Sequence, residues 1–218
     1  MRESLQNPFE ISSEGIPVYL VLLHLGADEV DTSLARLAEA IEQTVHVEDR
    51  VRSLLHESNW RSHLVGAIAA LLLGNEYNFS DSLWYAFDRG SWVQPQLAVT
   101  ASYTDPQFSE NAISRLNTGC LVRVKKNWWR CALQKISGRN FDLASKRSAK
   151  GVASLLAVCG SFPAIEAQMQ VFGQRKDIVA ILEEDERDFG ELATQWKSSL
   201  EAAFERYGKP LRPFEGHL

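Results

Sequence analysis

The residues from Ser58 to Gly74 read SNWRSHLVGAIAALLLG, and from Leu64 onward they are apolar on nearly every side of a helix. A helix that is hydrophobic all round is buried by its neighbours. The run is also far shorter than the roughly 20 apolar residues that a membrane-spanning helix needs. We therefore expect a central helix over about 60–73 that other helices cover, and no contact with a membrane.

Apolar residues elsewhere recur at steps of three or four, the spacing that predicts one buried helix face. The clearest case is the C-terminal segment 186–207, with apolar positions at Phe189, Leu192, Trp196, Leu200 and Ala203. No low-complexity linker divides the chain. The sequence therefore predicts a single all-helical domain over residues 1–218, with roughly nine to eleven helices, short loops and a C-terminal helix at about 186–207.

A pattern of helix, polar turn, Trp and second helix occurs twice, with Trp92 standing 32 residues after Trp60. A weaker copy follows when Gly74 is set on Gly160. The repeat-like helix pairs span about 47–74, 80–103 and 140–173. Helix pairs that cannot bury their apolar faces alone, and stack on like neighbours, form an α-solenoid. We expect stacked antiparallel helix pairs, with an irregular helical bundle as the alternative.

The stretch WRSHLVGAIAALLLG resembles the second helix of HEAT-type repeats, in which an Arg near the start precedes a run rich in Ala and Leu. Arg61 stands at the Arg position, whereas the second copy has Val93 there. The resemblance covers about residues 47–160. It implies a scaffold that binds other macromolecules, although a fold alone does not fix a function.

Charge is unevenly distributed along the chain, whose formal net charge is −5. Between Arg115 and Lys150 there are ten Lys or Arg residues and one acid, Asp142, which gives this segment +9 and the remainder −14. Such a polarised chain can use its basic segment to attract an acidic partner.

Within the basic segment, RVKKNWWRCALQK places cations beside aromatic rings, and we favour a helix from about Lys125 to Ile136 after a possible short strand. Arg and Trp are favoured anchors in protein interfaces, and the same pair suits nucleic-acid backbone and bases. A third interpretation pairs the segment with the chain's own acidic stretch at 183–191. The candidate binding residues are Lys125, Lys126, Trp128, Trp129, Arg130 and Lys135.

The sequence holds no recognisable catalytic or metal-binding set. His56 and His63 are seven residues apart, whereas a helical zinc pair is spaced by four. Cys131 lies among cations that lower a thiol pKa, but no His is within sixty residues to act as its base. We expect no catalytic residue, no metal and no cofactor. Four acids near helix ends are interpreted as helix caps: Glu57, Asp81, Asp88 and Asp105.

Three cysteines without CxxC spacing, and an N-terminus without a signal-peptide pattern, favour a cytoplasmic location. The leading functional hypothesis is a non-catalytic protein-binding module, such as an adaptor or an inhibitor or immunity-type protein, with an acidic protein partner. A nucleic-acid-binding helical-repeat protein of the DNA-repair kind is the alternative. An enzyme of unknown class is a second alternative, and the oligomeric state is left open.

Overall fold

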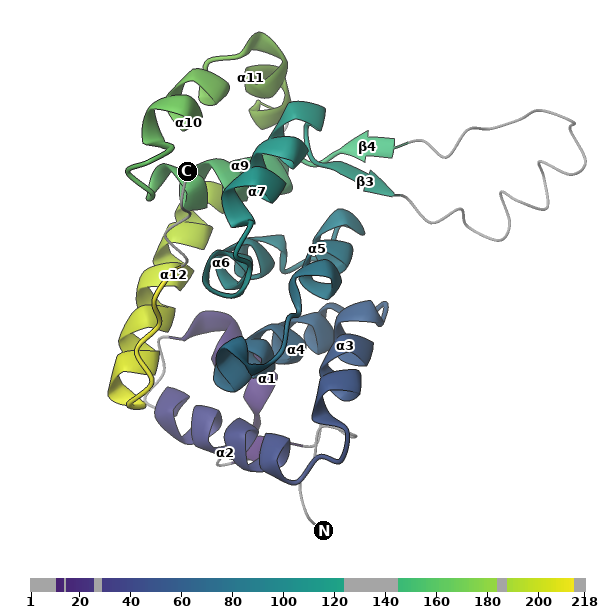
Figure 1. Ribbon diagram of the computed structural model, residues 1–218, viewed down its shortest axis with the longest axis vertical. Helices are drawn as coiled ribbons and strands as arrows, with labels where there is room; N and C mark the ends of the chain where they lie inside the picture. The colour runs from purple at the N-terminus through teal and green to yellow at the C-terminus, as the bar shows by residue number, and fades with distance from the viewer. Residues whose placement is uncertain (1–10, 14, 26–28, 124–144, 184–187, 214–218) are drawn as a thin grey trace, which may run out of the picture.

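Helices make up nearly all the regular structure of this chain (Figure 1). The structure is a computed structural model that describes residues 11–13, 15–25, 29–123, 145–183 and 188–213. In these ranges the strands form only two short antiparallel pairs, β1 (Ser12–Ser13) with β2 (Ile16–Pro17), and β3 (Leu121–Arg123) with β4 (Ser145–Arg147). The predicted all-α fold class is therefore confirmed.

Most of the described helices follow one another with short connections, whereas residues 119–148 separate α7 from α9. They are α1 (Val18–His24), α2 (Val30–Glu42), α3 (Val47–His56), α4 (Trp60–Leu73), the 3-10 turn η1 (Gly74–Glu76), α5 (Ser80–Asp88), α6 (Gln94–Thr104), α7 (Phe108–Thr118), α9 (Ala149–Gly160), α10 (Glu166–Gly173), α11 (Lys176–Leu182) and α12 (Phe189–Arg206).

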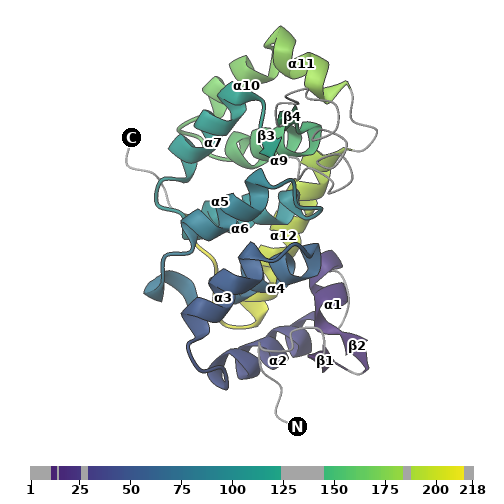
Figure 2. The ribbon, with the colours of Figure 1, turned by 90° about the vertical axis from the view of Figure 1, so that its right-hand side faces the viewer.

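Two helix pairs stack on each other. Helix α3 packs against α4 and α5 packs against α6; between the pairs, α3 contacts α5 and α4 contacts α6 (Figure 2). Helix α9 then packs on the other side of α6, so that α4, α6 and α9 follow one another in one layer. The helices α3 to α6 lie within the two segments in which the sequence shows the Trp-containing pattern.

Helix α4 is the central helix that its composition predicts. Every residue from Ser62 to Leu72 is buried, and α1, α2, α3 and α6 all contact it. Its approach to α3 is close at Gly66, where a Cβ would stand 3.1 Å from Cγ of Leu55. A side chain at position 66 would thus meet α3, because packed interiors leave little room for an added methyl group.

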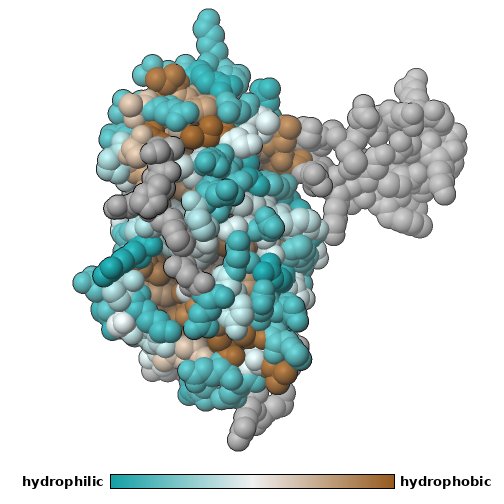
Figure 3. Space-filling view, in the orientation of Figure 1, coloured by the Kyte–Doolittle hydropathy of each residue, from teal (hydrophilic) through white to brown (hydrophobic). Residues whose placement is uncertain are grey.

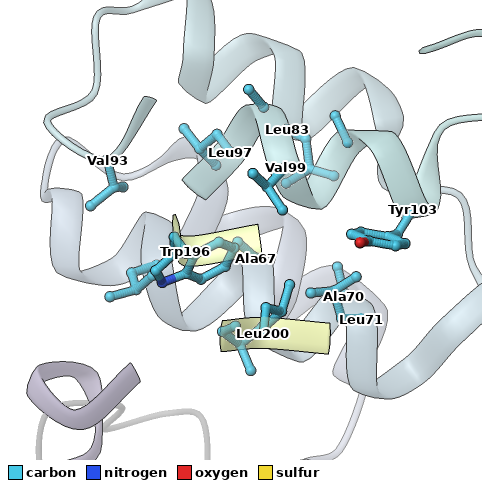
Figure 4. Packing of buried hydrophobic residues seen from close by; sticks show 14 of the residues in the cluster. Ala67, Ala70, Leu71, Leu83, Val93, Leu97, Val99, Tyr103, Trp196 and Leu200 are labelled. Atoms are coloured by element: carbon cyan, nitrogen blue, oxygen red, sulfur yellow. The ribbon is translucent and has the colours of Figure 1, made fainter. Parts of the chain in front are cut away.

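The last long helix, α12, runs along the stack and contacts α9, α6 and α2, at the left of Figure 1. Figure 4 shows Trp196 and Leu200 of α12 packing among apolar side chains from α4, α5 and α6. The indole nitrogen of Trp196 also donates a hydrogen bond to the carbonyl of Leu22 in α1, at 3.1 Å. Helix α12 thereby ties the first helix of the chain to the middle of the stack.

Two helix starts differ from the sequence expectation. The sequence around Ser91 and Trp92 predicts a helix that opens at these two residues, but α6 begins at Gln94, with Pro95 in its first turn. Ser80 and Asp81 are both residues that the sequence favours as the cap of α5, yet the side chain of Asn78 accepts the amide hydrogen of Ser80. Trp92 thus lies in the turn before α6, where it is half exposed.

Candidate functional site

The sequence-predicted binding residues lie outside the described residues. Lys125, Lys126, Trp128, Trp129, Arg130 and Lys135, together with Cys131 and the favoured helix at 125–136, all fall within 124–144. The strands on either side of that segment are described: β3 pairs with β4 in the register Leu121 to Arg147. The two ends of the basic segment are therefore held side by side.

Among the described residues, aromatic side chains gather where α1 meets the starts of α4 and α6. Trp60 and Trp92 have ring centroids 4.9 Å apart, and Tyr19 of α1 meets Trp60 edge to face at 6.1 Å. Trp92 is 50% exposed, an unusual state for so large an apolar side chain. We call Tyr19, Trp60, Arg61 and Trp92 the aromatic surface.

Arg61 supplies the positive charge of the aromatic surface. Its guanidinium carbon lies 4.7 Å from the ring centre of Trp60 and 5.5 Å from that of Tyr19. No carboxylate pairs with Arg61 among the residues that the structure describes, whereas Arg50, Arg52 and Arg115 each have one. Stacking on a ring leaves the edge donors of a guanidinium available to a carboxylate.

Next to Trp92 lies an apolar cavity of about 260 Å³. Its walls come from three segments that are far apart in the sequence: α1, the start of α6 with the turn before it, and the start of α12. The residues that line the cavity are Leu23, His24, Trp92, Gln96, Asp188, Phe189 and Leu192. Leu192, at 42% exposure, extends the apolar rim outward. We call this cavity the Trp92 pocket.

Specific contacts hold the walls of the Trp92 pocket in place. The bond from Trp196 to the Leu22 carbonyl fixes α12 against α1. Lys150 of α9 donates to the carbonyl of Trp92 at 3.2 Å, and its ammonium lies 5.4 Å from the ring centre of Phe189. Asp188 caps α12 by accepting the amide hydrogen of Glu191. The pocket is thus a product of tertiary packing.

A second, larger cavity of about 370 Å³ lies where the ends of α4 and α6 meet the C-terminal tail. Lys209 from the tail donates to the carbonyl of Leu72 at 3.3 Å, close to the end of α4. A cation in that position complements the negative end of a helix dipole. The tail residues 209–212 therefore form one wall of this cavity.

The two histidines of the α3–α4 region are engaged separately. His63 is buried, and its Nε2 lies 2.8 Å from the carbonyl of Glu57 while its Nδ1 lies 2.7 Å from the Ser91 hydroxyl. Because a carbonyl only accepts, Nε2 carries the hydrogen and Nδ1 accepts from Ser91. Burial lowers the pKa of His63. His56 instead faces Ser82, with Nε2 to Oγ at 3.3 Å.

The four acids interpreted as caps have different partners. Asp105 is buried and accepts the amide hydrogen of Gln107, the residue just before α7, although α7 itself has no side-chain cap. Its other bonds come from the indole of Trp84 at 2.6 Å and the amide of Asn111 at 2.9 Å.

The cap interpretation is wrong for two of the other acids, because each interacts with side chains and not with a backbone amide at a helix start. Asp88 forms a two-point ion pair with Arg115 at 2.8 and 2.9 Å. Glu57 accepts from Ser62 and pairs with Arg50 at 3.3 Å. Asp88 is satisfied by a residue of α7, and Glu57 by residues of α3 and α4, contacts that a single sequence does not display.

Two thiols are described, and both are buried: Cys120 and Cys159. Burial raises the pKa of both, to about 12 for Cys159, so neither has the low pKa of a nucleophilic thiol. The described ranges contain no group of three or more side chains that could hold a metal ion. In the same ranges no helix combines the length and the apolar character needed to cross a bilayer.

Sequence reasoning singled out Trp60 and Trp92 only as markers of a repeat, and the 32-residue offset was the available signal for their contact. It missed the pocket beside them, since no local pattern joins Leu23, Gln96 and Phe189.

Comparisons with family models, with curated proteins and with solved structures found no match to this chain. The function is therefore inferred from the chain's own residues.

Proposed function

We propose that this protein is a non-catalytic protein-binding module, and that it docks an acidic protein partner on the aromatic surface and the Trp92 pocket. The observation that carries the proposal is Trp92 itself, half exposed beside an apolar cavity and stacked on Trp60. An exposed large apolar group next to a cavity is typical of an interaction site.

The residue types present support a protein partner. Trp and Arg are enriched among the few residues that carry most of the energy of an interface. Here Trp60, Trp92 and Arg61 are already packed against one another. A rigid anchor loses less side-chain entropy on binding than a free one. The surface is thus organised before any partner arrives.

The size of the pocket favours a side chain over a cofactor or a drug-sized substrate. Pockets for such ligands usually measure about 300–1,000 Å³, whereas the Trp92 pocket measures about 260 Å³. Two ionisable groups near it are engaged in structural contacts: Asp188 caps a helix, and Lys150 donates to a carbonyl. Docking of one large side chain suits this space.

The helix arrangement supports a scaffold of the HEAT-like kind as part of the same proposal. Stacked pairs such as α3–α4 and α5–α6 present their connecting turns along one edge, and Trp60 and Trp92 both follow such turns. Residues 124–144, the middle part of the basic segment, add positive charge that would speed association with an acidic partner. A contribution from Lys125, Lys126 and Arg130 stays a prediction of the sequence.

The proposal is tested by affinity capture from the native cell lysate with three forms of the full chain: wild type, Trp92→Ala and Tyr85→Ala. Tyr85 of α5 is the matched control. Like Trp92, it is an aromatic residue that is partly exposed, at 41%, and stacked on a neighbouring ring, here that of His56 in α3. We expect one protein to be recovered in equal molar amount by the wild type and the Tyr85→Ala variant, and to be lost with Trp92→Ala.

The complex must then be rebuilt from the two purified proteins, so that an indirect contact is excluded. Recovery of the same proteins by all three forms would contradict the proposed surface. A different outcome would replace the proposal with nucleic-acid binding: only nucleic acid is recovered, nuclease removes it, and it is lost when Lys125, Lys126 and Arg130 are replaced together by Ala.

A further inference from the structure

We propose that the Trp92 pocket receives a Trp or Tyr side chain from an acidic segment of the partner, and that a carboxylate of the same segment binds Arg61. This inference rests on the proposed function and names the chemistry of its partner. It combines the pocket's apolar walls, a buried acceptor in those walls that has no hydrogen-bond partner among the described residues, and Arg61, with which no described carboxylate pairs.

The apolar part of the requirement comes from the pocket walls. Leu23, Phe189 and Leu192 bring hydrocarbon from α1 and α12, and the exposed ring of Trp92 closes the side toward the aromatic surface. Aromatic rings prefer offset or edge-to-face contacts with other rings. A planar side chain that enters this space can make such contacts with both Trp92 and Phe189.

The requirement for a donor comes from Gln96. Its side chain lines the pocket and is 2% exposed, and its Oε1 has no hydrogen-bond partner among the described residues. The neighbouring Gln94 shows the contrast, because its amide donates to the Phe87 carbonyl and accepts from Ser148. The oxygen is covered in the structure, so the carboxamide must turn toward the pocket before an indole N–H or a phenol O–H can donate to it. A Leu or Phe cannot satisfy it.

The carboxylate is placed by the polarity of the surface. Arg61 stacks on Trp60, which contacts Trp92, and Asp188 lines the Trp92 pocket. Lys150 also lies at the pocket, where it donates to the Trp92 carbonyl. A negative group on the partner is attracted toward these cations and repelled from Asp188. We place the carboxylate at Arg61, because stacking on a ring leaves its edge donors available.

The test selects a displayed library of random 12-residue peptides on the full-length protein. We expect the enriched peptides to contain Trp or Tyr with Asp or Glu within a few residues on one side. Trp92→Ala should weaken the best peptide by about 30-fold or more, and Arg61→Gln by about 10-fold. Arg36→Gln, which removes an equal charge from an exposed pair on α2, should leave the affinity within about twofold.

A double comparison tests the donor. The selected peptide should bind wild type about 10-fold more tightly than its Trp→Phe or Tyr→Phe analogue. In Gln96→Leu the ratio of the two affinities should fall to near one, because Leu lacks the acceptor oxygen while its side chain has a volume similar to that of Gln. Gln96→Leu should also remain folded, since it removes a buried oxygen without a partner.

Three results would overturn the inference: enrichment of purely aliphatic or basic peptides, no enrichment at all, or an equal preference for Trp over Phe in wild type and Gln96→Leu. These failures are separable from failure of the proposed function. A partner that is captured through Trp92 while no peptide is selected would leave the binding module standing and reject the inserted ring.

Discussion

The indole rings of Trp60 and Trp92 lie 4.9 Å apart between their centres and tilt by 50° to each other. Trp60 follows the turn between α3 and α4, Trp92 lies in the turn between α5 and α6, and the two helix pairs stack. The 32-residue offset between the two residues thus corresponds to one step along the stack. Their contact places one ring partly inside and leaves the other half exposed beside the Trp92 pocket.

Replacing Trp196 by Phe should destabilise the fold by about 1–3 kcal/mol, because the carbonyl of Leu22 then loses its buried donor. The free energy of unfolding is measured by urea denaturation. Trp92→Phe is the control and should stay within about 0.5 kcal/mol of wild type, since Trp92 is half exposed. Equal effects of the two substitutions would show that the Trp196 bond does not anchor α12 to α1.

Asp105→Asn should cost about 2 kcal/mol of the free energy of unfolding. Its carboxylate accepts from Trp84, Asn111 and the Gln107 amide, and an amide side chain would turn a donor toward one of these groups. Asp81→Asn, at an exposed site in the first turn of α5, serves as the control. A urea midpoint for Asp105→Asn equal to that of the control would contradict the described network.

The fold should lose stability as the pH falls below about 6.5, the ordinary pKa of His63. Burial lowers the pKa of His63 in the folded state, so the unfolded chain binds more protons in this window and protonation favours unfolding. Arg89, Glu57 and His56 are the charged or titratable groups that act on it, with opposite signs. The stability is therefore fully present above pH 6.5 and declines toward the lowered pKa.

This dependence is measured as the free energy of unfolding between pH 7.5 and about 5.5. The slope should flatten in His63→Gln, whereas His46→Asn, which changes an exposed residue with a left-handed backbone, should keep the wild-type slope. An unchanged slope in His63→Gln would assign the pH dependence to other groups.

Cys120 and Cys159 should not react with a thiol reagent in the native protein. Burial raises both pKa values, so little thiolate forms at neutral pH, and the sulfur atoms are covered. The measurement uses Cys131→Ser, which leaves only these two thiols, with Ellman's reagent before and after addition of guanidinium chloride. Prompt reaction before unfolding would contradict the burial of these residues.

Helices were predictable because their signal is local. The apolar run in α4 and the spacing of Trp196 and Leu200 in α12 follow directly from helix geometry and burial. The start of α6 was misplaced by a few residues, since Ser91 serves as a partner of His63 and not as the first turn of the helix. Helix ends depend on such contacts, which the local sequence does not contain.

The candidate site was less accessible to sequence reasoning. The basic segment drew attention through its charge and its adjacent Trp128 and Trp129, which fall outside the described residues. The Trp92 pocket carries no comparable local signal, because Leu23 and Phe189 are brought together only by the packing of α12 against the start of the chain. The 32-residue offset between Trp60 and Trp92 drew attention to one residue of the pocket wall, Trp92.

Hydrogen–deuterium exchange of the full chain, with and without the captured partner, tests the docking surface most directly. We expect new protection in three separate segments: the end of α1 at Leu20–His24, the turn and helix start at Ser91–Gln96, and the start of α12 at Asp188–Leu192. Protection confined to 124–144 or to the outer faces of α3 and α5, with none in these three segments, would contradict the account.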